Sequence, residues 1–171
     1  MLGRMAVFAG GIVAAALVLP GLATSYLERP QAGTVAQPVN VSPAAYTGGR
    51  SVVLPPGPGG HFLATFTING RKADGMVDTG ASMIAINIST ARRLGISTGS
   101  LSFTARANTA NGIVKGAAVM LDRVEIGAIA VKDVQAMVLP DKSLSGMLVG
   151  MSFLNKLSSY KVENGALHLT R

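Results

Sequence analysis

The chain has 171 residues, with 15 Lys and Arg against 8 Asp and Glu and a formal net charge of +7. This length fits one domain of ordinary size with an attached tail. The absence of cysteine excludes disulfide scaffolds, thiolate metal sites and cysteine nucleophiles. Only two histidines are present, so neither a histidine-rich metal centre nor a serine triad is expected. Any chemistry is left to carboxylates, hydroxyls and lysines.

The positive charge is scattered along the chain. No run of adjacent basic residues is longer than two, and aromatic residues make up 5% of the sequence. A nucleic-acid partner is therefore not expected. Residues 61–171 alone carry +5, which leaves open weak binding to an anionic lipid or cell-wall polymer. We expect no metal and no cofactor.

The N-terminal segment, residues 1–27, is dominated by an uncharged apolar stretch at 5–27. As a helix rising about 1.5 Å per residue, this stretch would span about 35 Å, enough for a bilayer core of about 30 Å. Two interpretations stay open: a signal peptide cleaved after Ala23, or a retained transmembrane anchor. Both predict a bacterial protein whose remaining residues lie in the periplasm, either held at the inner membrane or released from it.

A flexible linker is predicted at residues 28–60, which are rich in Pro, Gly, Ala, Ser and Thr. Its last six residues read Pro-Pro-Gly-Pro-Gly-Gly. A less favoured alternative is that residues 46–54 add an edge strand to the domain that follows. We place that domain at residues 61–171.

Residues 61–171 contain short apolar, β-branched stretches separated by turn residues. Asn-Gly pairs at 69–70 and 164–165 favour tight hairpin turns. Short helices are predicted at 89–94, opened by a hydroxyl cap, and at 152–157. Strands are predicted at 61–68, 72–77, 83–88, 102–107, 113–121, 129–139, 160–162 and 166–169, with another beginning at 124–127. The pattern predicts a mostly β fold, a small closed barrel with one or two short helices.

One carboxylate stands out by its position between two predicted strands. Asp78, Thr79 and Gly80 follow one apolar stretch and precede another, which puts the carboxylate on a tight loop. The Asp-Thr-Gly-Ala-Ser sequence is followed by a glycine-tipped hairpin about 30 residues on, and by Leu-Val-Gly at 148–150 before a helix. This order resembles the retropepsin-like aspartic proteases. The stretch at 148–157 further resembles a bacterial, membrane-tethered group of these proteins.

The resemblance implies an acid-protease barrel and assigns roles within it. Asp78 would be the catalytic carboxylate, Thr79 would brace two such loops across a dimer axis, and the Gly80 amide would donate to the carboxylate. Ser82 would contact the substrate backbone, at a place where many retroviral enzymes carry an acid. Residues 148–150 would support the loop from beneath. A flap over the substrate would be formed by Asn108, Thr109, Ala110, Asn111 and Gly112.

Aspartic protease chemistry needs two carboxyl groups that share a proton. This chain has one Asp-Thr-Gly, so the second carboxylate would come from a second copy in a two-fold homodimer. The predicted function is an aspartic endopeptidase that hydrolyses a peptide or an exported or membrane-adjacent protein. The alternative is a non-catalytic module of the same fold that binds peptides or serves assembly.

Overall fold

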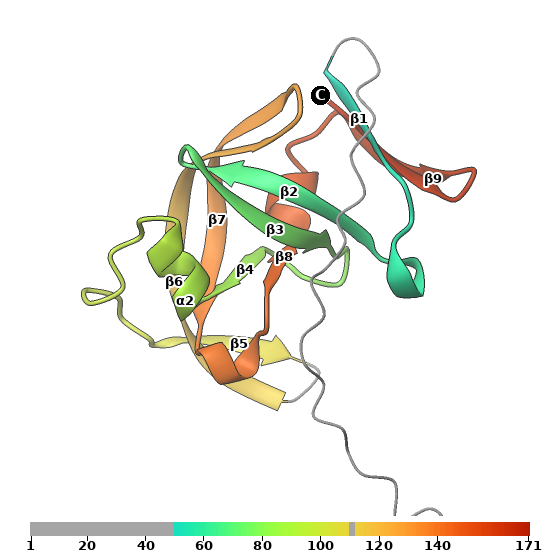
Figure 1. Ribbon diagram of the computed structural model, residues 1–171. Helices are drawn as coiled ribbons and strands as arrows, with labels where there is room; N and C mark the ends of the chain where they lie inside the picture. Colours follow the sequence, from blue (N-terminus) through green and yellow to red (C-terminus); the bar gives the residue numbers. More distant parts are fainter. Residues whose placement is uncertain (1–49, 110–111) are drawn as a thin grey trace, which may run out of the picture. The chain divides into compact units, whose positions relative to one another are not determined.

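The computed structural model describes residues 50–109 and 112–171 (Figure 1). Two α-helices and two short 3-10 turns accompany the strands of these residues. The strands are β1 Ser51–Leu54, β2 Phe62–Ile68, β3 Arg71–Val77, β4 Ile84–Asn87, β5 Ala105–Thr109, β6 Gly112–Ile126, β7 Ile129–Leu139, β8 Met147–Val149, β9 Ser159–Glu163 and β10 Ala166–Thr170. The helices are α2 Ile88–Arg93 and α3 Met151–Leu154, and the 3-10 turns are η1 Pro58–Gly60 and η2 Asp141–Ser143.

Six strands close into a barrel in the order β2-β3-β8-β4-β7-β6. The barrel closes where Thr67 and Ile68 of β2 pair antiparallel with β6. The β3–β8 and β4–β7 pairs are parallel, and the β4–β8 pair is antiparallel. Strand β5 forms a hairpin with the first part of β6 (Figure 1). The predicted closed, mostly β fold with short helices is confirmed.

The interior of the barrel is filled by aliphatic side chains, because successive residues of a strand point to opposite faces. The two aromatic rings of the core, Phe66 on β2 and Phe153 on α3, are fully buried. They meet edge to face, with ring centroids 5.9 Å apart. Burying a side chain of this size contributes about 1.5–3 kcal/mol, so α3 is anchored to the barrel by its apolar face.

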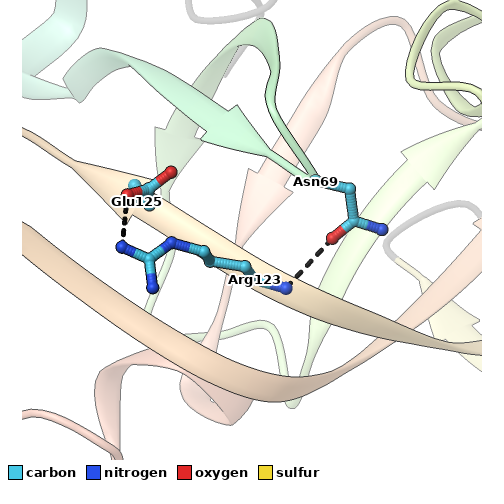
Figure 2. Close-up of polar contacts among 3 residues, drawn as sticks. All are labelled: Asn69, Arg123 and Glu125. Carbon is cyan, nitrogen blue, oxygen red and sulfur yellow. Dashed lines mark hydrogen bonds and ion pairs between the residues drawn. The ribbon is translucent and has the colours of Figure 1, made fainter.

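The hairpin turn between β2 and β3 is tied to β6. Asn69 and Gly70 both have positive φ, 48° and 83°, the conformation that a tight Asn-Gly turn requires. The Asn69 amide donates to the carbonyl of Arg123 at 2.9 Å, and its side-chain oxygen accepts from the Arg123 amide at 3.0 Å (Figure 2). The Arg123 side chain turns toward Glu125, at 2.8 Å (Figure 2). The turn therefore fastens the barrel where β2 meets β6.

Helix α2 begins one residue earlier than predicted, and its N-terminus is capped by the side-chain amide group of Asn87. The side-chain oxygen of Asn87 accepts from the Thr90 amide at 2.8 Å, while its nitrogen donates to the carbonyl of Leu144 at 3.0 Å. The predicted hydroxyl cap is therefore wrong. Ser89 instead donates from its amide and its hydroxyl to the Asp141 carboxylate, both at 2.9 Å. These contacts join α2 to the segment around η2.

Strand β1 lies within the stretch predicted as a linker. It pairs antiparallel with β10 in a second sheet of order β1-β10-β9. Its inward side chains, Val52 and Leu54, are fully buried. The predicted linker end at residue 60 is therefore wrong, and the edge-strand alternative is confirmed for Ser51–Leu54. The short Val-Val-Leu pattern of this strand stands directly before a proline-rich run, and that run favoured the linker prediction.

Two other predicted bounds differ from the structure. The stretches predicted separately at 113–121 and 124–127 form the single long strand β6, because the pairing with β7 keeps one register from Leu121 to Val124 although the two residues between them are exposed. Helix α3 ends at Leu154, earlier than predicted.

The predicted apolar segment at 5–27 and most of the predicted linker lie outside the described residues. Among residues 50–109 and 112–171, no helix has the length and apolar character needed to cross a membrane.

Candidate active site

Asp78 lies immediately after β3, on the loop that leads to β4 (Figure 1). Its side chain is half-buried, whereas Thr79 and Gly80 are exposed. The Gly80 amide donates to Oδ1 of Asp78 at 2.8 Å, as the sequence resemblance implies. A Cβ atom at position 80 would lie only 3.1 Å from the same oxygen. Glycine therefore lets the backbone approach the carboxylate closely enough to orient it.

Strand β8 supports the loop from beneath. It lies between β3 and β4, with Val77 and Val149 paired in parallel. The Asp78 amide continues this ladder by donating to the Val149 carbonyl at 3.0 Å. Both ends of the loop are thus attached to one short strand, which confirms the support predicted for residues 148–150.

Gly150 brings the start of α3 against the far half of the loop. The Met151 amide donates to the Ala81 carbonyl at 2.8 Å. A Cβ atom at position 150 would collide with the Ala81 carbonyl oxygen and would lie 2.6 Å from that of Met83. Only glycine allows this close passage of two backbones.

Ser152 connects three segments around the loop. Its hydroxyl accepts from the Ile84 amide at 3.0 Å and donates to the Gln135 carbonyl at 2.7 Å. Its own amide donates to the Ser82 carbonyl at 3.1 Å. Sequence reasoning missed this role and placed Ser152 only at the start of the short helix predicted at 152–157. A hydroxyl at the second position of a helix that follows Leu-Val-Gly is the signal that could have indicated it.

A pocket of about 350 Å³ opens beside Asp78 and Thr79. Asp78 is the one carboxylate among the residues that line it. The described residues contain no group of three His, Asp or Glu side chains close enough to hold a metal ion. The lining comes from the start of β2, the end of β3, and strands β9 and β10, and comprises Gly60, His61, Phe62, Val77, Asp78, Thr79, Tyr160, Lys161, Val162 and Leu167.

The predicted flap is a hairpin of β5 and β6. Asn108 lies opposite Ile113, and the Thr109 hydroxyl donates to the Gly112 carbonyl at 2.8 Å. Gly112 has a φ of 102°, a conformation that favours glycine. Ala110 and Asn111 lie outside the described residues. The hairpin is confirmed, but its described residues do not line the pocket beside Asp78.

The substrate-binding roles therefore stay predictions. Ser82 lies exposed on the same loop as Asp78, where its carbonyl is held by the amide of Ser152. Asn108 is exposed on the hairpin and Thr109 is half-buried there. The structure thus brings Asp78, Thr79, Gly80 and Ser82 together on one loop and keeps the hairpin residues as a separate group.

Comparison with known proteins connects this geometry to one family. The family model described as gag-polyprotein putative aspartyl protease matches residues 64–156. The structure of a retropepsin-like aspartic protease from Rickettsia conorii is similar, with 32% sequence identity and a TM-score of 0.63. The match covers 75% of this chain and 95% of that one.

Two curated relatives are uncharacterized proteins. One, from the cobV 5′ region of a Sinorhizobium species, is 37% identical over 122 residues, which are 71% of this chain and 52% of the relative. The other, from Rickettsia prowazekii strain Madrid E, is 36% identical over 111 residues, 64% of this chain and 47% of the relative. The chain therefore spans about half the length of these relatives.

The family match runs through every segment that positions the carboxylate: the Asp78 loop, β8 and the start of α3. The solved structure matches over nearly its whole length. The chain belongs to the retropepsin-like aspartic protease family.

Proposed function

We propose that this protein is an aspartic endopeptidase that acts as a homodimer, with the two Asp78 carboxylates side by side. The observation that carries this proposal is the placement of Asp78 itself. It stands at the end of a barrel strand, oriented by the Gly80 amide and backed by the Val149 carbonyl, at the edge of a pocket. A carboxylate so held, in a chain of this family, fits the role of half a catalytic pair.

The paired carboxyl groups would divide the chemistry between them. Two adjacent carboxyl groups do not both ionise easily, because their negative charges would repel each other. One carboxyl therefore keeps its proton while the other is ionised. The ionised Asp78 takes a proton from water as the water oxygen attacks the carbonyl carbon of the peptide bond, and the protonated Asp78 donates to the carbonyl oxygen. The tetrahedral intermediate then collapses as the C–N bond breaks, and a proton passes to the leaving amine.

Thr79 supports the dimeric arrangement. It follows Asp78 directly and is exposed to solvent in the single chain. A second copy that brings its own Asp78 to the axis must also bring its Thr79 loop, and an exposed hydroxyl there is available to bridge the two loops.

The proposed substrate is an extended segment of an exported or membrane-adjacent protein. An extended peptide can pair its backbone with strand edges and place alternate side chains in pockets. The β5–β6 hairpin is the proposed flap, with Ser82 and Asn108 as contacts to the peptide. The periplasmic or inner-membrane location rests on the apolar segment at residues 5–27.

The test compares the full chain, purified in detergent, with its Asp78→Asn variant on a pool of proteome-derived peptides. We expect Asp78→Asn to lower cleavage by at least about a hundredfold, since general acid–base catalysis of this kind contributes that much. Asp122→Asn, a change at an exposed carboxylate on β6, is the matched control and should cleave like the wild type. Undiminished cleavage by Asp78→Asn would overturn the proposal. A folded wild type that cleaves nothing would favour the non-catalytic module.

A further inference from the structure

Positive charge is concentrated in one part of the domain. Between Asp78 and Asp122 the sequence carries four basic residues and no acidic one. Two of the four end helix α2, and the other two, Arg106 on β5 and Lys115 on β6, lie on the hairpin that these strands form. This stretch therefore supplies most of the net positive charge of residues 61–171.

Arg106 and Lys115 lie directly opposite each other in the β5–β6 hairpin. Both residues are exposed, and within residues 50–109 and 112–171 neither forms an ion pair. Like charges directly opposite each other, with Cβ atoms about 5 Å apart, destabilise a sheet. The two cations therefore repel each other unless an anion from outside these residues approaches both of them.

A second basic pair on β6 is built differently. Arg123 lies opposite Lys132 of β7. Here the Arg123 guanidinium bonds the Glu125 carboxylate at 2.8 Å (Figure 2). The Arg123–Lys132 pair is thus compensated by an acid of the same strand, whereas the Arg106–Lys115 pair has no such acid in the described part of the chain.

An exposed apolar side chain accompanies the Arg106–Lys115 pair. Ile113 lies two residues before Lys115, so the two share one side of β6. Ile113 is 59% exposed, whereas Val114, on the other side of the strand, is half-buried. Paired cations beside a large apolar side chain fit a lipid interface, where anionic headgroups lie next to acyl chains. A polar anionic polymer would satisfy the cations but would offer nothing to Ile113.

The sequence also gives a reason for this partner to be close. The uncharged apolar stretch at 5–27 is long enough to enter a bilayer, and 22 residues separate it from residue 50. Fully extended, these residues would reach about 75 Å. A domain tethered in this way stays near the lipid surface, which raises the effective concentration of headgroups around it.

We propose that the exposed side of the β5–β6 hairpin, with Arg106, Ile113 and Lys115, binds the surface of an anionic lipid bilayer. The two cations contact the headgroups, and Ile113 enters the boundary between headgroups and acyl chains. The other side of the hairpin, with Ala107 and Val114, stays half-buried. The choice of lipid as partner rests on the proposed membrane location, whereas the binding itself requires neither paired carboxylates nor a second copy.

The sequence contains no tryptophan, so a single tryptophan can report lipid contact. The full chain with Ile113→Trp is reconstituted into phosphatidylcholine vesicles whose acyl chains are brominated and quench nearby tryptophan. Adding about 30% phosphatidylglycerol should strengthen quenching several-fold, and about 1 M salt, where the Debye length is about 3 Å, should reverse this gain. Val162→Trp is the matched control, because Val162 is 61% exposed but lies on β9. Equal quenching of the two tryptophans would overturn the proposal.

Charge variants identify the side chains responsible. In the Ile113→Trp chain, Arg106→Gln and Lys115→Gln each remove one positive charge, and each should lower the equilibrium constant for lipid contact by about fivefold. Lys132→Gln removes the same charge from the compensated pair and should leave quenching unchanged. If Lys132→Gln lowered quenching as much as the hairpin variants, only net charge would matter and the proposed surface would be wrong. Circular dichroism checks that each variant is folded.

The outcomes separate this inference from the proposed location and function. Flotation of the vesicles on a density gradient shows whether the chain stays with the membrane. A chain that floats with neutral and anionic vesicles while Ile113→Trp stays unquenched keeps the anchor and overturns the hairpin surface. A chain that floats only with anionic vesicles, and is quenched there, keeps the hairpin surface and overturns the anchor. Adding Asp78→Asn to the Ile113→Trp chain should leave quenching unchanged, whatever its effect on cleavage.

Other occupants of the hairpin give different results. If a second copy covers this side, the emission of Ile113→Trp in neutral detergent should shift to the blue as the protein concentration rises. If a bound peptide covers it, the same shift should follow addition of peptide without lipid. Either shift, in the absence of quenching by anionic vesicles, would overturn the lipid assignment.

Discussion

Asp78 has two contrasting sides. Beneath it, the same chain supplies the supporting contacts. The Val149 carbonyl accepts from the Asp78 amide, the first residue of α3 bonds the loop at Ala81, and Gly150 allows the backbone before α3 to pass close to the loop. On the other side are the exposed Thr79, an open pocket and an edge of β9 that pairs with no other strand of residues 50–109 and 112–171. The position of the carboxylate is therefore set within one chain, whereas its proposed pairing with a second carboxylate would depend on association. A site prepared in this way loses less free energy to ordering when the partner arrives.

The strongest way to break the supported side is Gly150→Ala. Its Cβ would meet backbone carbonyls, which unlike a flexible side chain cannot turn aside. We expect the free energy of unfolding in urea to fall by about 1–3 kcal/mol. The loop should also be displaced, which should lower the rate of peptide cleavage by about a hundredfold.

Gly146→Ala is the matched control for this change. It lies four residues earlier, and a Cβ there would have no atom within 4 Å. It should unfold and cleave like the wild type. If Gly150→Ala were as stable and active as Gly146→Ala, the close passage beneath the loop would not be needed.

Ser152→Ala tests a weaker part of the same support. It removes one hydroxyl that bonds both the Ile84 amide and the Gln135 carbonyl. Because the site is partly accessible to water, we expect a loss of about 1–2 kcal/mol of unfolding free energy. Ser152→Thr keeps a hydroxyl and should recover part of the loss. Equal stability of the alanine and threonine variants would show that the hydroxyl is not the cause.

Asp141→Ala lies outside both regions and should have the smallest effect. Hydrogen bonds from the Ser89 amide and hydroxyl hold the pKa of Asp141 below its ordinary value of 3.8. Since the unfolded chain binds this proton more readily, the contribution to stability is present above about pH 4 and is lost as the pH falls through the lowered pKa.

Urea unfolding across pH 2–7 measures this contribution. Asp141→Ala should be slightly less stable than the wild type at neutral pH, with the two converging in acid. A constant difference between Asp141→Ala and the wild type at every pH would contradict the assignment.

The sequence predicts best those features that local chemistry determines. Asn69 and Gly70 specify their turn, and a glycine after two apolar residues marks the passage beneath the Asp78 loop. What the sequence does not reveal is pairing over long distances. Strand β1 is short and meets β10 more than a hundred residues later, so the local pattern allows an edge strand but does not favour it over a linker. The bridging role of Ser152 likewise depends on three segments that only the fold brings together.

The pairing of β1 with β10 also determines where a mechanical load enters the domain. Chain preceding residue 50 joins the domain at β1, and the Arg171 amide bonds the Arg50 carbonyl at 2.9 Å. A pull on the N-terminal segment would therefore act first on a four-residue strand, outside the barrel. We expect β1 to detach before β3 or β8 is disturbed, which would leave Asp78 in place while uncovering Leu167 and Leu169. Tension at the N-terminal side would thus change the sheet that carries β9 sooner than it changes the carboxylate.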